Sequence, residues 1–198
     1  MKKVTYLILT GAILGVAAGA LFYLFNRYVG PRDIVEQRTE TQGTPSGDIY
    51  EGLREQALAV TPETLELTQQ GNEVIVHGIV FDWNLGEGIA TLVAFQTGDV
   101  SYYLSTGGGA IGGGSHENVR RAAADFLDEA QRNLSKSSRT SSTPLPGMNS
   151  MKFYLLTNKG TFVADEHMEH IEDESSKWLS LFLQANHVIT EMRKSTGG

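Results

Sequence analysis

The chain has no cysteine among its 198 residues. This absence excludes disulfides, cysteine-ligated zinc, iron–sulfur clusters and thiol catalysis, although it does not report the cellular compartment. No internal repeat is present either. The chemistry available to the protein is therefore limited to oxygen and nitrogen side chains and to the backbone.

Basic side chains are also outnumbered by acidic ones outside residues 1–30. The formal net charge of the whole chain is −7. Residues 1–30 contain three basic side chains and no acidic one, so the other 168 residues carry 13 basic and 23 acidic side chains, a net charge of −10. A surface of this sign repels phosphate backbones and anionic lipid surfaces. The charge therefore argues against nucleic acid as a partner.

Charge is absent altogether from residues 4–25, which begin at Val4 and end at Phe25. At about 1.5 Å per residue, such a helix spans a hydrocarbon core of about 30 Å, and a lone segment in lipid satisfies its backbone only as a helix. We therefore expect a single-pass membrane anchor within residues 1–30 that contacts the lipid bilayer. A cleaved signal peptide is the alternative, with a cleavage-like site at Ala18–Ala20, but the apolar run continues past it.

The charges that flank this segment are nearly balanced between its two ends. Lys2 and Lys3 precede it, whereas Arg27, Arg32 and Arg38 follow it, so the positive-inside rule separates the two orientations weakly. The signal-like layout favours an internal N-terminus and a soluble domain on the extracytoplasmic side.

Three glycines recur four residues apart within the apolar run, at Gly11, Gly15 and Gly19. At helical spacing they share one face, and small residues there let a second helix backbone approach closely. The pattern predicts a helix-association face, although glycine is also simply common in membrane helices.

The rest of the chain divides by composition. Residues 31–48 are polar and predict a flexible tether. Residues 49–194 predict one soluble domain, in which the Ser-, Thr- and Pro-rich stretch 135–149 predicts a mobile loop. The final residues, 195–198, predict a disordered tail.

Hydrophobic periodicity predicts an α+β domain in the order α-βββ-α-ββ-α. Because the first three strands follow one another through short turns, they must pair antiparallel. One antiparallel sheet covered by helices, in two layers, is the economical arrangement. The expected helices span residues 49–60, a segment from 115 onward, and 175–194, and the expected strands span 73–83, 89–96, 100–105, 151–157 and 161–164.

The most unusual local feature lies between the third strand and the second helix, where six glycines fall within eight positions. Glycine permits positive φ, and backbone N–H groups beside a helix N-terminus can hold an anion. The dinucleotide pattern fails because no βαβ unit and no strand-ending acid follow. The predicted ligand- or partner-binding residues are Gly107, Gly108, Gly109, Gly112, Gly113, Gly114, Ser115 and His116.

Two interpretations of this glycine segment remain open. The glycines can serve a flexible connector or close helix–sheet packing, or they can bind a ligand or partner. Since the domain is acidic, a neutral or zwitterionic ligand, or the backbone of another protein, suits the segment better than an anion.

Two further clusters allow an enzymatic alternative. Ser115, His116 and Glu117 with Asp82 invite acid–base chemistry if they converge in space. His167 and His170 share a face of any local helix and could hold a metal, although their spacing matches neither standard zinc motif, and a solvated acidic lead-in to the last helix is the alternative.

The leading hypothesis is a membrane-tethered, non-enzymatic binding or assembly module that uses the glycine segment, without a cofactor, a catalytic residue or a metal site. Its expected partners are a membrane protein or a second copy of the chain. A membrane-anchored hydrolase or metal-dependent enzyme, and a purely structural subunit of a membrane complex, are the alternatives.

Overall fold

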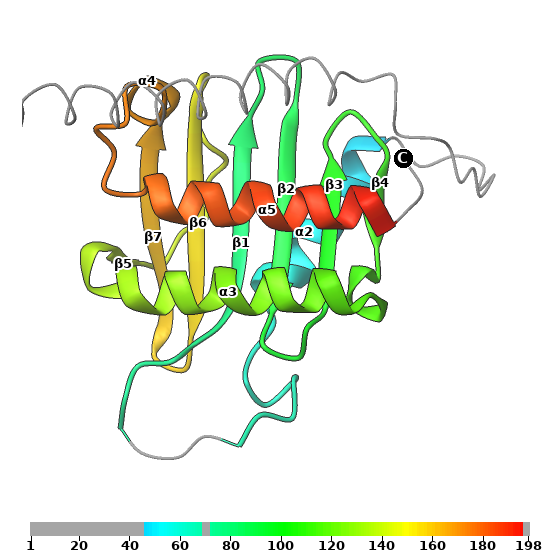
Figure 1. Ribbon diagram of the computed structural model, residues 1–198, viewed down its shortest axis with the longest axis vertical. Helices are drawn as coiled ribbons and strands as arrows, with labels where there is room; N and C mark the ends of the chain where they lie inside the picture. Colours follow the sequence, from blue (N-terminus) through cyan, green and yellow to red (C-terminus); the bar gives the residue numbers. More distant parts are fainter. Residues whose placement is uncertain (1–45, 69–71, 196–198) are drawn as a thin grey trace, which may run out of the picture.

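The computed structural model describes residues 46–68 and 72–195 (Figure 1). Seven strands form one antiparallel sheet, and its helices give a two-layer α+β fold, as the sequence predicts. The helices are α2 (Ser46–Leu58), α3 (Glu117–Asn133), α4 (Met168–Glu172) and α5 (Leu179–Ser195), with short 3₁₀ turns η1 (Gly113–Ser115) and η2 (Leu134–Lys136). The strands are β1 (Val76–Asn84), β2 (Ile89–Phe95), β3 (Val100–Leu104), β4 (Gly109–Ile111), β5 (Ser138–Thr140), β6 (Ser150–Thr157) and β7 (Gly160–His167).

The strand order across the sheet is β4-β3-β2-β1-β6-β7-β5. The predicted meander and hairpin are both present, and they join where β1 pairs antiparallel with β6. Two three-residue strands that the sequence analysis does not predict, β4 and β5, close the two ends of the sheet. The predicted strand over 161–164 continues to His167, and α4 follows it directly.

β1 lies at the centre of the sheet and is buried on both faces, which explains its nearly continuous apolar sequence. Its side chains alternate between the faces, as the period of two requires. Phe81 and Trp83 join the larger core under α3 and α5, whereas Val80 joins a smaller cluster with Tyr50 of α2. Helices α3 and α5 therefore form the helical layer over the larger core on one face, and the single helix α2 packs on the smaller cluster of the other face (Figure 1).

The larger core is built on aromatic contacts between β1, β6 and α5. The Phe81 and Phe153 rings stack with centroids 4.5 Å apart, and Trp83 meets Phe182 edge-on at 5.3 Å. Pairs of this geometry add about 0.5–1.5 kcal/mol each beyond the area they bury. They fix the distance between the sheet and α5.

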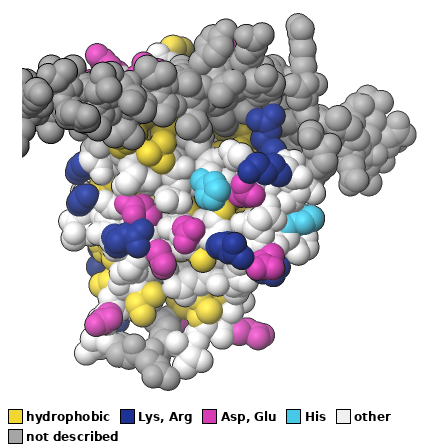
Figure 2. Space-filling view, in the orientation of Figure 1, with side chains coloured by type: hydrophobic (Ala, Val, Ile, Leu, Met, Phe, Trp, Pro, Cys, Tyr) yellow, Lys and Arg dark blue, Asp and Glu magenta, His cyan; other side chains and the backbone are white. Residues whose placement is uncertain are grey.

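The outer face of α3 and α5 carries interspersed acidic and basic side chains (Figure 2). Arg121 pairs with Glu117, and Lys194 pairs with Glu191, at helical spacing. Exposed pairs of this kind contribute little to stability. This face has the mixed charge of a solvated surface.

The predicted mobile loop, 135–149, contains the end of η2 and all of β5, and its later residues contact α2 and the end of β1. Arg54 donates to the carbonyl oxygen of Thr143 at 2.8 Å, and Asn84 donates to that of Pro146 at 3.2 Å. The groups that hold this segment come from distant parts of the chain, so its composition alone does not reveal them. Its mobility stays a prediction.

The predicted membrane anchor at 4–25, with Gly11, Gly15 and Gly19, lies outside the described residues, as do most of the tether and residues 196–198. Across 46–68 and 72–195, no helix combines the length and apolar character needed to cross a membrane. Helix α2 begins three residues earlier than predicted, and α5 reaches Ser195.

Candidate functional site

The glycine segment forms the β3–β4 turn, the edge strand β4 and the turn η1 that leads into α3. Four of its glycines have φ in the left-handed range, at 100° for Gly107, 85° for Gly108, 154° for Gly109 and 81° for Gly112. Residues that carry a side chain rarely adopt these φ values. The glycine composition is therefore required by the backbone path at these positions.

Close packing explains a second group of glycines. A Cβ on Gly109 would overlap the carbonyl oxygen of Tyr102, and one on Gly114 would overlap that of Gly98. A Cβ on Gly113 would lie 3.0 Å from the Met192 side chain of α5. The packing interpretation therefore holds at these three positions, whereas a Cβ on Gly112 would meet open space.

Several backbone N–H groups of the segment already donate to local carbonyls. Gly107 donates to Leu104 at 3.0 Å, Ser115 donates to Gly112 at 3.3 Å, and His116 donates to Gly113 at 3.1 Å. An anion cradle needs N–H groups that converge on an empty point. These three groups do not provide one, which weakens the small-anion interpretation.

The outer edge of β4 offers a different surface. Leu104 donates to the Gly108 carbonyl at 3.0 Å, and Tyr102 is the register partner of Ala110. Because hydrogen-bonded pairs alternate along an antiparallel ladder, the N–H and C=O groups of Gly109 and Ile111 point away from β3. The Ile111 side chain is 69% exposed. The edge thus combines outward backbone groups with an exposed apolar side chain.

The fold does not bring the candidate catalytic residues together. Ser115, His116 and Glu117 are exposed at the start of α3, on the helix-covered face of the sheet. The Asp82 side chain is fully buried and faces α2, on the opposite face. Asp82 therefore does not join Ser115, His116 and Glu117 in the acid–base set proposed from the sequence.

Asp82 belongs to a buried polar network beneath α2. Its Oδ2 accepts two hydrogen bonds from Arg54, at 2.9 and 2.6 Å, and its Oδ1 accepts one from Thr91 at 2.7 Å. The hydroxyls of Tyr50 and Thr91 lie 2.9 Å apart. These contacts satisfy a charge that would otherwise be costly to bury. The network fastens α2 to the sheet.

Burial by itself would lower the pKa of Arg54, but its hydrogen bond to Asp82 and the charge of that carboxylate outweigh burial, so the pKa is raised. Burial raises the pKa of Tyr50 to about 12. The guanidinium of Arg54 therefore stays charged, and the phenol of Tyr50 stays neutral, across the physiological range. This network is not predicted from the sequence, although Arg54 lies on the buried stripe of α2 with Tyr50 and Ala57, which is the available signal.

The two histidines of the proposed metal site have separate partners. His167 Nδ1 lies 3.0 Å from Ser150 Oγ, and His170 Nδ1 lies 2.6 Å from Glu166 Oε1. The hydrogen bond to Glu166 and its charge raise the pKa of His170. In the described part of the chain, no group of three or more His, Asp or Glu side chains is arranged to hold a metal ion.

No protein-family model, curated protein or solved structure matches this chain. A functional surface is therefore inferred from the geometry of the chain's own residues. Among the predicted binding residues, Gly109 begins β4, and Gly108 and Gly112 flank this strand, so its outer edge is the surface nearest to them.

Proposed function

We propose that the domain is a non-enzymatic binding or assembly module that accepts an extended segment of a partner protein along the outer edge of β4. The observation that carries this proposal is an uncharged strand at one end of the sheet, with outward backbone groups at Gly109 and Ile111. An edge of this kind is a template for strand addition.

Two properties of the edge suit a partner backbone better than a small ligand. Outward N–H and C=O groups occur at every second residue of β4. Another strand can form hydrogen bonds with both kinds of group, whereas an anion can accept only from the N–H groups. The exposed Ile111 provides an apolar contact on one face. In strand addition the main chain supplies affinity and such side chains supply specificity.

The proposal includes the membrane tether. An anchor at residues 4–25 would hold the β4 edge near a bilayer, with the domain on the extracytoplasmic side, so the partner would be a membrane protein or a second copy. Extraction of cell membranes at alkaline pH, with protease protection of sealed vesicles, tests this part. Release of the intact chain by alkali would contradict an uncleaved anchor.

Site-specific crosslinking tests the binding edge directly. The photoreactive residue p-benzoylphenylalanine is placed at Ile111 on β4 or, as the matched control, at Arg139 on β5, and intact cells are irradiated. Both positions lie on exposed three-residue edge strands. We expect discrete protein adducts from position 111 and none from position 139. Equal adducts from both positions, or none from either, would refute the β4 proposal.

A further inference from the structure

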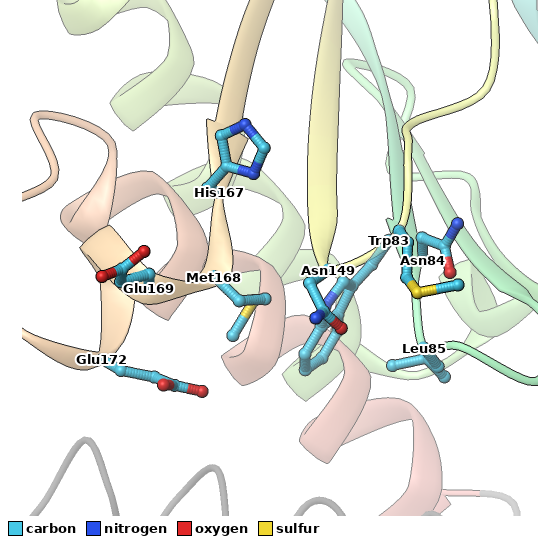
Figure 3. Close-up of a pocket in the computed structure, with 9 residues that line it drawn as sticks. Trp83, Asn84, Leu85, Asn149, His167, Met168, Glu169 and Glu172 are labelled. Carbon is cyan, nitrogen blue, oxygen red and sulfur yellow. The ribbon is translucent and has the colours of Figure 1, made fainter.

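A cavity of about 450 Å³ lies far from β4, where β1 ends and β7 passes into α4 (Figure 3). This volume is within the range of small-molecule sites. His167, Met168, Glu169 and Glu172 lie on one side of the space, and Asn149, Trp83, Asn84 and Leu85 lie on the other (Figure 3). Met148 completes the lining.

The inner wall is apolar and held in place. Trp83 is 2% exposed, and its ring contacts Phe182 edge-on and stacks on Phe81 with centroids 6.4 Å apart. Met168 is buried opposite it. A wall fixed by such packing does not have to reorganise when an apolar group binds, which lowers the cost of binding.

The rim is polar and acidic. Glu169 and Glu172 come from α4, and Asn84 and Asn149 come from the sheet side. Figure 3 shows the Glu172 side chain directed across the opening, whereas the Glu169 carboxylate points away from it. None of the nine lining residues is Lys or Arg. The local field therefore favours a positive charge over a negative one.

Two further observations concern the walls of this cavity. Asn149 has a positive φ of 54°, and its carbonyl accepts the Met168 N–H at 2.9 Å, which ties the two walls together. Residues held in sparsely populated backbone regions cluster at binding sites. Met148 is 74% exposed beside the opening, so it adds accessible apolar surface to the lining.

We propose that this cavity binds a small organic cation, an amine that carries an apolar group. The apolar group lies against Trp83 and Met168, and the ammonium lies at the rim beside Glu172. An anion would meet the two carboxylates, and a neutral apolar molecule would leave them without a charged partner. This site is independent of the β4 edge, so neither proposal depends on the other.

Fluorine NMR of the full-length chain labelled with 5-fluorotryptophan tests the site. The chain has two tryptophans, and Trp83 lines the cavity whereas Trp178 is buried before α5 and serves as the internal reference. The probes are phenethylamine, 2-phenylethanol and phenylacetate, which share a ring and differ in charge. We expect saturable movement of the Trp83 signal with phenethylamine, a weaker response to the alcohol and none to the anion, with Trp178 unmoved.

Charge variants separate a built cation site from simple apolar binding. Glu172→Gln is expected to raise the dissociation constant of phenethylamine about fivefold, the size of one partly exposed charge pair. Glu55→Gln, an exposed position on α2 at the opposite face of the sheet, is the matched control and should leave it unchanged.

Three results would overturn the proposal. A Trp83 signal that does not respond to phenethylamine would remove the site. Equal responses to the amine, the alcohol and the anion would remove the preference for a cation. An unchanged dissociation constant in Glu172→Gln would remove the role of the acidic rim. Partner adducts at position 111 would be unaffected by any of these results.

Discussion

The two ends of the sheet are closed by strands of equal length and opposite character (Figure 1). β5 reads Ser-Arg-Thr, and Arg139 projects a charge from its centre toward the β6–β7 turn at Gly160. β4 reads Gly-Ala-Ile and has no charge. Charged side chains on an edge are a common protection against unwanted strand pairing. One edge of this sheet has that protection, and the other does not.

The segments next to the two edge strands also differ, and again the β5 side is the more protected. β5 is followed by a segment that Arg54 and Asn84 hold to the sheet through backbone carbonyls. β4 is flanked by glycines with positive φ. Both edge strands have three residues, yet only β5 carries a charged side chain. The difference indicates that this fold protects one edge against strand pairing and leaves the other open.

The largest expected effect comes from the network that supports the β5 side. Arg54→Met would leave the Asp82 carboxylate buried without its cation, and we expect a loss of about 3 kcal/mol in the free energy of unfolding. Hydrogen exchange should accelerate in residues 138–143 more than in 109–111, because Arg54 also holds the Thr143 carbonyl. Denaturant titration and hydrogen exchange measure these effects.

A double variant is the control for this prediction. Arg54→Met with Asp82→Leu removes both charges, and apolar replacement of a buried pair is often close to neutral. It should recover most of the lost stability. A single variant within about 0.5 kcal/mol of wild type would contradict the role given to the network.

The glycines on the β4 side should be nearly as sensitive. Gly109→Val places a side chain against the Tyr102 carbonyl at φ 154°, and we expect a loss of about 2–3 kcal/mol in the free energy of unfolding. Gly147→Ala, where a Cβ meets open space, is the matched control and should change it by less than about 0.5 kcal/mol. Equal effects of both substitutions would show that packing at Gly109 is not special.

Exchanging the character of the two edges tests the comparison itself. Ile111→Lys adds a protective charge to β4, and we expect about tenfold weaker partner capture from membranes with stability unchanged within about 0.5 kcal/mol. Arg139→Ile removes the charge from β5 and should create new association at that end, measured by crosslinking and analytical ultracentrifugation. Partner capture that survives Ile111→Lys undiminished would assign binding elsewhere.

The smallest effect concerns the central strand that the two edges share. Burial lowers the pKa of His77, and its hydrogen bond to the Val60 carbonyl offsets this only in part. Below the ordinary His pKa near 6.5 the unfolded chain then binds more protons than the folded one, so stability falls as the pH falls. Free energies of unfolding between pH 7.5 and 5.5 should decline more steeply in wild type than in His77→Gln. Parallel slopes would exclude His77 as the source.

Much of the fold is predictable from the sequence because its signals are local. The runs at 73–83 and 89–96 and the short turn between them specify antiparallel strands, and the stripe from Val119 to Ala130 specifies α3. The candidate site is predictable in part. Its glycines stand out in composition, but composition does not separate Gly109, which is required by packing, from the exposed Gly112.

The sequence by itself determined helices α2, α3 and α5, the five longer strands, the antiparallel meander and the location of the glycine segment. It also predicts the anchor at residues 4–25. Each of these depends on residues that are neighbours along the chain, through hydrophobic period, turn length and backbone freedom. Only the tertiary structure decided that β1 pairs with β6, that β4 and β5 become the edges, and that Arg54 neutralises Asp82. Only it decided that Trp83 and Glu172 line one cavity. These features join residues far apart in sequence, so packing and pairing energies across the whole domain select them.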